Sequence, residues 1–323
     1  MGTLVGHVAP GVGFLVIGLW HLFNHIRLYA VRPGSYRARP WFPAPLARYL
    51  EPALIIAGSL ASIAMELFIG PEAHQPFDSD GSIPSNHLHN FEHASISLSL
   101  LLYAAFAIHL DRDRNRRRSS TTTTTHGAAR SLARDALTLL LAAAALAQEL
   151  LIFHLHSADH MGVEGQYHWL LQCVVAVSLA TTLLGIAHPA SFAVAFVRSV
   201  SLVLQGVWFV AMGVMLWTPS LIPKGCFLNY EEGHHVVRCR DPDALGRAKS
   251  LVNLQFSWYV SATAVFAVAA FLFITKLYPE EPDYVPLVKA ADEDDDDLEA
   301  QKLAESQSFA RMRDGMKPIE LER

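Results

Sequence analysis

Seven long apolar runs, separated by polar loops, are the feature that most restricts how this chain can fold. A helix needs roughly 20 mostly apolar residues to cross a bilayer, and about seven runs reach that length. The composition agrees, because 52% of the 323 residues are hydrophobic and only 17% are charged, whereas about a quarter are charged in a soluble domain. The sequence therefore predicts an all-α, polytopic membrane helical bundle with about seven transmembrane helices.

Arginine-rich loops predict the orientation of these helices. The loops at 29–49 and 111–134 are rich in arginine, and short loops of this kind face the cytoplasm. We therefore expect a lumenal or extracellular N-terminus and a cytoplasmic C-terminus, with residues 1–277 forming the seven-helix transmembrane domain. The arginines of the second loop also suit contact with anionic lipid. The expected spans are about 6–28, 51–70, 86–110, 137–156, 167–187, a sixth ending near 217, and 251–276.

Residues 278–323 are predicted to form a cytoplasmic, acidic and disordered tail. The tail contains the acidic block 292–299, and blocks of like charge are typically solvated. The sequence Tyr284-Val-Pro-Leu287 fits a tyrosine-based sorting signal, which predicts contact with a sorting adaptor. An integral membrane protein of the endomembrane system or plasma membrane is expected, with membrane lipids as partners and no nucleic acid. In the lumenal loop 218–250, we expect Cys226 and Cys239 to be bonded, because disulfides persist in that compartment.

Ionisable residues gather at the lumenal ends of the expected spans. Charged groups are costly inside a membrane, so each one is a candidate for function. His89 and His93 are four residues apart on a helix, as are His156 and His160, so each pair can bind one metal ion from one helix face. Such ligands suit a divalent transition metal such as zinc or iron. The candidate metal ligands are Glu66, His89, His93, His156, His160 and His168, and the candidate catalytic carboxylates are Glu92 and Glu149.

The polar residues also have structural interpretations. Histidine and glutamate in spans can hydrogen-bond between helices, and we expect this role for Gln205, Asn253 and Gln255. At the cytoplasmic ends, His21 and His25 are again four residues apart. Two stacked haems would use histidines near both membrane faces as axial ligands. We favour instead interfacial anchoring beside Arg27 and Arg112, which makes haem the weaker cofactor hypothesis, and we expect Arg198 to extend to the cytoplasmic water.

Three motifs resemble those of the transmembrane protein 45 family. They are Gly-His-Val-Ala-Pro-Gly-Val-Gly-Phe from Gly6 with Gly-Leu-Trp-His21, Asn-His-Leu-His-Asn-Phe-Glu-His93, and the stretch from Glu149 to His160. The resemblance covers roughly residues 1–277 and implies a multi-pass membrane fold, without an agreed activity. A weaker likeness to seven-span zinc hydrolases of the ceramidase and progestin-receptor type ends at the last span, because that span has no histidine.

Three functional hypotheses follow. In the first, a metal held by His93, His156 and His160 activates water or oxygen beside Glu92 or Glu149, and the substrate is a lipid. In the second, the protein transports protons or metal ions, and a polar path continues from Glu149 toward the histidines at the other ends of the helices. In the third, the protein is a non-catalytic trafficking or scaffold component, and the polar residues only stabilise the fold.

Overall fold

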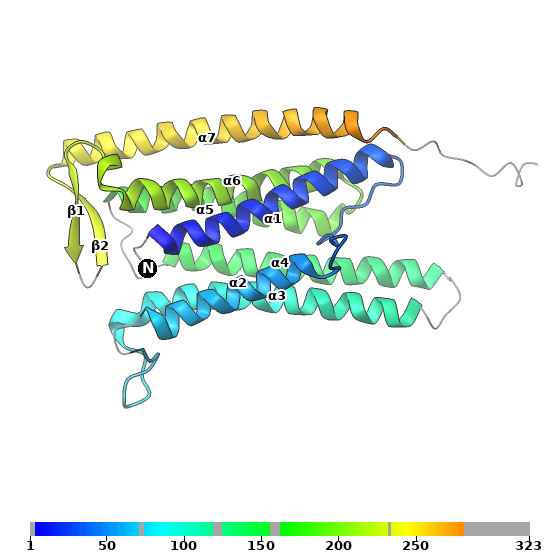
Figure 1. Ribbon diagram of the computed structural model, residues 1–323, viewed down its shortest axis with the longest axis horizontal. Coiled ribbons are helices and arrows are strands. Elements are labelled where there is room, and N and C mark those ends of the chain that lie inside the picture. The colour runs from blue at the N-terminus through cyan, green and yellow to red at the C-terminus, as the bar shows by residue number, and fades with distance from the viewer. Residues whose placement is uncertain (1–3, 71–73, 119–124, 156–161, 232–233, 281–323) are drawn as a thin grey trace, which may run out of the picture. The chain divides into compact units, whose positions relative to one another are not determined.

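The computed structural model describes residues 4–70, 74–118, 125–155, 162–231 and 234–280. Within these ranges, seven helices are long and apolar enough to cross a membrane, and they run side by side as a bundle (Figure 1). The predicted helical, multi-pass class is therefore confirmed. The helices are α1 (Leu4–Val31), α2 (Leu50–Ala64), α3 (Leu88–Arg118), α4 (Thr125–Leu155), α5 (Gly162–Ala187), α6 (Phe192–Trp217) and α7 (Pro242–Leu277).

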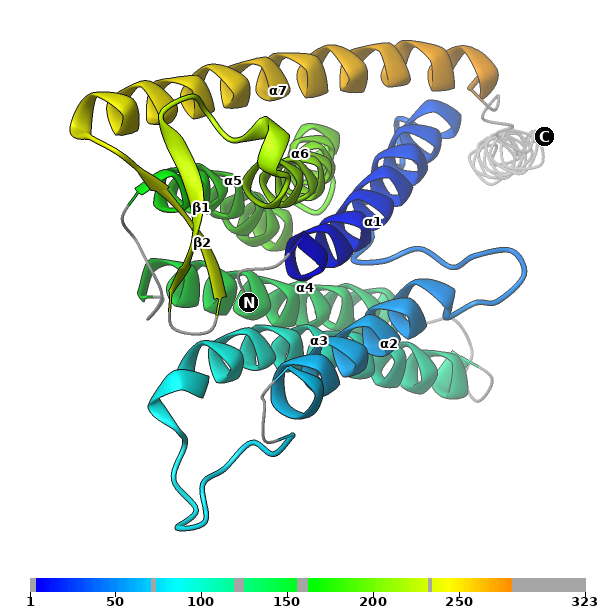
Figure 2. The same cartoon turned by 60° about the vertical axis from the view of Figure 1, so that its left-hand side comes forward.

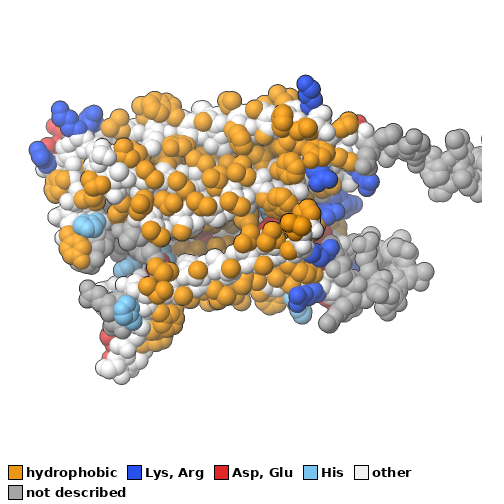
Figure 3. All heavy atoms as spheres, viewed as in Figure 1, with side chains coloured by type: hydrophobic (Ala, Val, Ile, Leu, Met, Phe, Trp, Pro, Cys, Tyr) orange, Lys and Arg blue, Asp and Glu red, His pale blue; other side chains and the backbone are white. Residues whose placement is uncertain are grey.

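The outer surface of the bundle is apolar over its middle and charged near its ends. Hydrophobic side chains cover most of the face in Figure 3, whereas lysine and arginine gather toward the two ends. On α7, Val265 and Phe273 are 71% and 65% exposed. Side chains of this kind need an apolar solvent on the outside, as a bilayer provides. The distribution is that of helices embedded in lipid.

Two groups of helices build the bundle (Figure 2). Helices α2, α3 and α4 pack in sequence, and α4 also packs on α5. The second group consists of α1, α5, α6 and α7, in which α7 lies against the other three. The helix α6 is the centre of this group, with the aromatic side chain of Trp208 fully buried.

Glycines bring α1 and α6 into close contact. Gly11 and Gly18 of α1 face α6, and a Cβ atom added at Gly18 would lie 2.6 Å from the backbone nitrogen of Val203. Across the interface, a Cβ atom added at Gly206 would lie 2.3 Å from the backbone nitrogen of Leu15. The absence of a side chain at Gly11 and Gly18 therefore allows the close approach of α1 to α6.

The bundle has two distinct ends. The hairpin end contains the start of α1 and the strands β1 (Cys226–Glu231) and β2 (His234–Cys239), which pair antiparallel. The arginine end contains the loop 32–49 and the turn between α5 and α6 (Figure 1). Cys226 and Cys239 are disulfide-bonded across the hairpin, as expected.

Four local features differ from the expected spans. The hairpin was not predicted, and α7 begins at Pro242, where the Asp241 carboxylate accepts a hydrogen bond from the Ala244 N–H at 2.7 Å. Helix α4 begins earlier than expected, at Thr125. The end of the second span is a π-helical turn, Met65–Ile69, a geometry often found at functional sites.

Candidate functional site: a buried polar column

Helix α6 presents a row of polar side chains to the interior of the bundle. Arg198, Ser201 and Gln205 are three and four residues apart in the sequence, so they lie on one helix face. All three are buried, and Gln205 is 0% exposed. Polar groups in the apolar interior of a bundle must find partners among the neighbouring helices. The row therefore requires polar partners on α4, α5 and α1.

Glu149 of α4 is the partner at one end of this row. The Gln205 amide Nε2 donates to Glu149 Oε1 at 2.8 Å, and the glutamate is 1% exposed. Within the described part of the chain, the second carboxylate oxygen, Oε2, is buried without a hydrogen-bond partner. A carboxylate held by a single amide is poorly compensated for its charge. Glu149 is thus equipped to bind a proton or a cation.

Hydroxyl groups extend the contacts from Gln205 toward the arginine end. The Ser178 hydroxyl of α5 lies 3.4 Å from Gln205 Oε1 and 2.9 Å from the Ser201 hydroxyl. The Ser201 hydroxyl donates to the backbone carbonyl of Arg198 at 2.8 Å. The Ser178 hydroxyl has a single proton, so it can donate to Gln205 or to Ser201 but not to both at once. A series of polar contacts therefore joins three helices and leads from Glu149 to the backbone of Arg198. We call this series, with the Arg198 side chain, the polar column.

The column ends in a buried cluster at the arginine end. Arg198 Nη2 donates to the Arg39 carbonyl at 3.2 Å and lies 3.3 Å from His25 Nε2. Because a guanidinium can only donate, His25 Nε2 accepts, and the histidine proton is on Nδ1. That proton points to the Tyr36 hydroxyl oxygen, 2.9 Å away. Burial raises the pKa of Tyr36 above its ordinary value, so its phenol stays neutral. His25 is therefore a neutral, fully partnered residue.

A second carboxylate lies in the same cluster. Glu51 Oε1 contacts His21 Nε2 at 2.7 Å, and Glu51 Oε2 accepts a hydrogen bond from the Phe42 N–H at 2.9 Å. Glu51 and His21 are both buried. Both oxygens of this carboxylate are thus partnered, and Glu51 attaches the loop 32–49 to the start of α2.

One comparison with known proteins applies to these helices. Residues 135–272 match the model of a family of unknown function, DUF716. The match spans α4 to α7 and includes every side chain of the polar column, from Glu149 to Arg198. The partners on α1 and on the loop 32–49, His25 and Tyr36, lie outside the matched residues.

The described residues that were predicted for a metal site, Glu66, His89, His93 and His168, lie at the hairpin end. Asn90 Nδ2 donates to Glu66 Oε2 at 2.8 Å, and His93 Nδ1 lies 3.4 Å from Glu66 Oε1. The ring centroids of His89 and His93 are 6.4 Å apart. Glu92 is half-buried on the same helix. Glu66 and His93 therefore form one pair between α2 and α3, while Glu149 belongs to the polar column.

His168, the remaining predicted ligand that the structure describes, is not gathered with this pair. His168 Nδ1 donates to the Glu164 carbonyl at 3.2 Å, and its ring lies 5.8 Å from that of His7. His156 and His160 lie outside the described residues. Among the residues that the structure does describe, no three His, Cys, Asp or Glu side chains are grouped in a way that could hold a metal ion.

The predictions for His21, His25 and Arg198 at the arginine end need correction. His21 and His25 were expected to anchor at the membrane interface, but they are 4% and 0% exposed. Arg198 was expected to reach water, but it is 3% exposed and bonded to His25 and Arg39. The reason is that the loop 32–49 folds over these side chains. Its Tyr36 and Arg39 provide partners for His25 and Arg198, and Glu51 of α2 provides the partner of His21. The four-residue spacing of His21 and His25 was the sequence signal that could have indicated a buried histidine pair on one helix face.

The predicted interhelical roles of Gln205, Asn253 and Gln255 are confirmed.

Proposed function

We propose that this protein is a proton-linked membrane transport protein in which Glu149 binds and releases the proton. The single observation that supports this proposal is the buried series of polar contacts from Glu149 to the backbone of Arg198. Ionisable side chains facing the interior of a helical bundle commonly mark ion pathways. A polar path leading from Glu149 toward His25 is also the feature that distinguishes transport from the two other hypotheses.

The chemistry at Glu149 requires only protonation and deprotonation. When Oε2 takes up a proton, the carboxyl group becomes neutral and still accepts the Gln205 hydrogen bond through Oε1. When the proton leaves, the charge must be met by a cation, by water or by a movement of α4 relative to α6. Glu149 thereby links its proton to the packing of two helices. The proposed orientation has the hairpin end lumenal or extracellular and the arginine end cytoplasmic, following the distribution of arginine between the loops.

The test is proton flux into vesicles. The purified full chain is reconstituted into liposomes that contain a pH-sensitive dye, a pH difference is imposed, and its decay is recorded. The wild type should dissipate the gradient faster than empty vesicles, and Glu149→Gln should reduce the flux to the level of empty vesicles. Glu280→Gln, at an exposed position after α7, is the matched control and should retain the flux. Equal flux in Glu149→Gln and wild type would reject the proposal.

A metal-dependent activity at the hairpin end is a second candidate. It is favoured by the 3.4 Å contact between Glu66 and His93 beside a π-helical turn. Zinc or iron would take ligands from this pair together with His89, His156, His160 or His168, and Glu92 would act as the base toward a lipid substrate. Metal analysis by mass spectrometry should then find stoichiometric metal in the wild type and none in His93→Ala. Absence of metal in both would remove this candidate, and a Soret band would select haem.

The resemblance to the transmembrane protein 45 family, the sorting signal at Tyr284 and the cytoplasmic tail remain proposals alongside these. They support a third candidate, a trafficking component of the endomembrane system or plasma membrane. In that case, deletion of residues 281–323 should abolish correct localisation in cells, while Glu149→Gln should leave it unchanged.

A further inference from the structure

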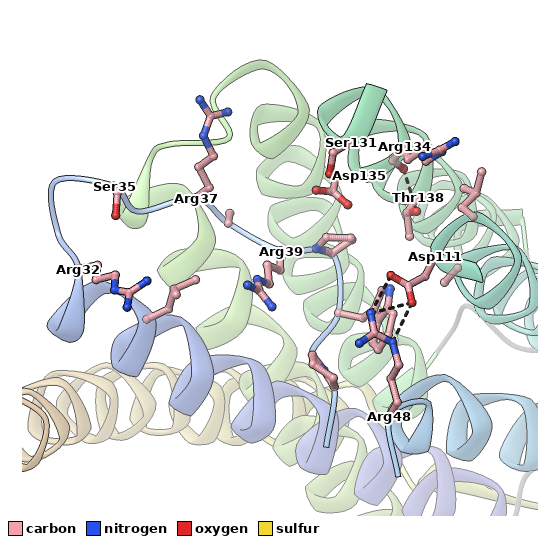
Figure 4. A pocket seen from close by; sticks show the side chains of 17 residues that line it. Arg32, Ser35, Arg37, Arg39, Arg48, Asp111, Ser131, Arg134, Asp135 and Thr138 are labelled. Carbon is pink, nitrogen blue, oxygen red and sulfur yellow. Dashed lines mark hydrogen bonds and ion pairs between the residues drawn. The ribbon is translucent and has the colours of Figure 1, made fainter. Parts of the chain in front are cut away.

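The arginine end contains a pocket that the transport proposal does not use. It has a volume of about 470 Å³ and lies between the loop 32–49, the end of α3 and the beginning of α4. Figure 4 shows the loop on one side of the pocket and α4 on the other. Pockets that bind small ligands in proteins commonly have volumes of about 300–1,000 Å³. Five arginines line this one: Arg32, Arg37, Arg39, Arg48 and Arg134.

The loop presents its arginines because it is locally extended. Along residues 35–40, the side chains alternate between exposed and buried, with Tyr36 and Ala38 inside and Arg37 and Arg39 outside. An extended backbone directs successive side chains to opposite sides. Both arginines are exposed and line the pocket, and their side chains leave the loop in different directions in Figure 4. Tyr36 is buried and attaches the loop to the bundle.

Contacts to three other elements hold this segment in place. The Ala38 N–H donates to the Pro189 carbonyl at 2.8 Å, and the Arg39 carbonyl accepts from Arg198 at 3.2 Å. The Phe42 N–H donates to Glu51 at 2.9 Å. Because both flanks of Arg39 are fixed by buried hydrogen bonds, the loop forms a pre-organised wall. Pre-organised donors lose little conformational entropy on binding a ligand.

The pocket has an excess of positive charge. It is lined by the five arginines and by two aspartates, Asp111 and Asp135. Arg48 donates two hydrogen bonds to Asp111, at 3.0 and 3.1 Å, and this contact raises the pKa of Arg48. In the part of the chain that the structure describes, the guanidinium groups of Arg37 and Arg39 make no hydrogen bond or ion pair to another side chain. These two groups are available to an anionic ligand.

We propose that this pocket binds a phosphate-bearing anionic headgroup. Guanidinium groups donate paired hydrogen bonds to phosphate oxygens, which makes arginine the preferred residue for such ligands. The pocket also has an apolar part, formed by Leu28, Ala107 and Leu110 near the ends of α1 and α3. A headgroup contacting Arg37 and Arg39 would thus lie beside apolar surface suited to the first carbons of an acyl chain. The phosphate can belong to a membrane lipid or to a free solute.

Binding to the purified full chain in detergent tests the proposal and separates these two sources. The first probe is dioctanoyl phosphatidylinositol 4-phosphate, the second is its free headgroup, inositol 1,4-bisphosphate, and the zwitterionic control is dioctanoyl phosphatidylcholine. Both phosphate probes should bind more tightly than the control, and their affinity should fall as salt is added. Tighter binding of the lipid than of the free headgroup assigns the site to a membrane lipid, and equal binding assigns it to a soluble phosphate.

Two variants test the location of the site. Arg37→Gln/Arg39→Gln should weaken binding of the phosphate probes about thirtyfold. Arg240→Gln/Arg247→Gln, which removes two exposed arginines at the hairpin end, is the matched control and should bind like the wild type. Ser35→Trp keeps every charge and places a large side chain against the pocket, so it should also reduce binding even if the double variant does not fold.

Two results would overturn the proposal. One is equal affinity of the wild type for the phosphate probes and for dioctanoyl phosphatidylcholine. The other is unchanged affinity in folded Arg37→Gln/Arg39→Gln or in folded Ser35→Trp, with folding checked by circular dichroism and thermal unfolding. Neither result depends on proton flux, so this inference and the transport proposal can fail separately.

Discussion

Two buried glutamates in this protein have opposite surroundings. Glu51, in the cluster under the loop 32–49, has a partner for each oxygen, His21 and the Phe42 N–H. Glu149, in the polar column, has Gln205 for one oxygen and, within the described residues, no partner for the other. Both are less than 5% exposed. Burial alone therefore does not distinguish the two carboxylates, whereas the number of donors around each one does, and this difference supports the proposal that Glu149 exchanges a proton.

The comparison assigns different roles to the two ends of the column. At the arginine end, both carboxylate oxygens of Glu51 and both ring nitrogens of His25 have partners, so this end fixes the loop. Two nitrogens there, His21 Nδ1 and Arg198 Nη1, are buried without a hydrogen-bond partner among the described residues. Glu149 is the carboxylate that has such an atom, Oε2, and unsatisfied buried groups in native proteins commonly have a functional reason. The column thus connects a rigid support to a group that can change its protonation.

The largest loss of stability is expected from a substitution that separates α1 from α6, because this disturbs both the cluster around Glu51 and the polar column. Gly206→Ala would place a Cβ atom 2.3 Å from the Leu15 backbone nitrogen and push α6 away from α1. Because backbone cannot move aside as a flexible side chain can, the free energy of unfolding should fall by about 3 kcal/mol or more. Thermal unfolding in detergent would measure it. Gly13→Ala is the matched control, since open space surrounds that position, and its stability should not decrease. Equal midpoints of thermal unfolding for Gly206→Ala and Gly13→Ala would show that α1 and α6 are not in close contact at Gly206.

Glu51→Gln should destabilise the protein by about 1–3 kcal/mol. The amide can accept from only one of the two donors, His21 or the Phe42 N–H, and its own NH₂ group then faces the other donor. Chemical unfolding in mixed micelles would give the change. Unfolding unaffected by this substitution would mean that Glu51 does not hold the loop.

Tyr36→Phe should cost about 1 kcal/mol, because the phenol oxygen that accepts the His25 Nδ1–H is lost. A pH effect adds to this. Burial raises the pKa of Tyr36 in the folded state, so its contribution is complete below the ordinary tyrosine pKa of about 10 and is lost as the pH rises toward the folded-state value. The wild type should thus lose stability above about pH 10 more steeply than the variant. Parallel pH profiles for the two proteins would contradict this assignment.

Glu149→Gln should have the smallest effect on stability, within about 0.5 kcal/mol. The amide oxygen can still accept from Gln205, and the new NH₂ group replaces an oxygen that has no donor. Among the stability measurements, the difference between Glu149→Gln and Glu51→Gln tests most sharply whether the two glutamates have different roles. A loss in Glu149→Gln equal to that in Glu51→Gln would place both glutamates in the same structural class.

The sequence predicted the helices better than the site, for physical reasons. The spans follow from the length of apolar runs, and the disulfide follows from two cysteines in one loop that the distribution of arginine predicts to be lumenal. The spacing of His21 and His25 placed them on one helix face, but the interfacial interpretation was wrong, because a loop folds back over them and their partners come from this loop and from α2. The unpartnered oxygen of Glu149 depends on which side chain α6 places opposite it. Contacts between distant segments of this kind have no local sequence signal.

Infrared difference spectroscopy on the reconstituted protein tests the central claim most directly. A carboxylic acid has a C=O stretching band that its carboxylate lacks, so a buried group that exchanges protons produces a band that changes with pH. Between about pH 5 and pH 9, the wild type should show one such band, which Glu149→Gln abolishes and Glu51→Gln retains. A band that survives in Glu149→Gln, or that disappears in Glu51→Gln instead, would contradict the assignment of the exchangeable proton to Glu149.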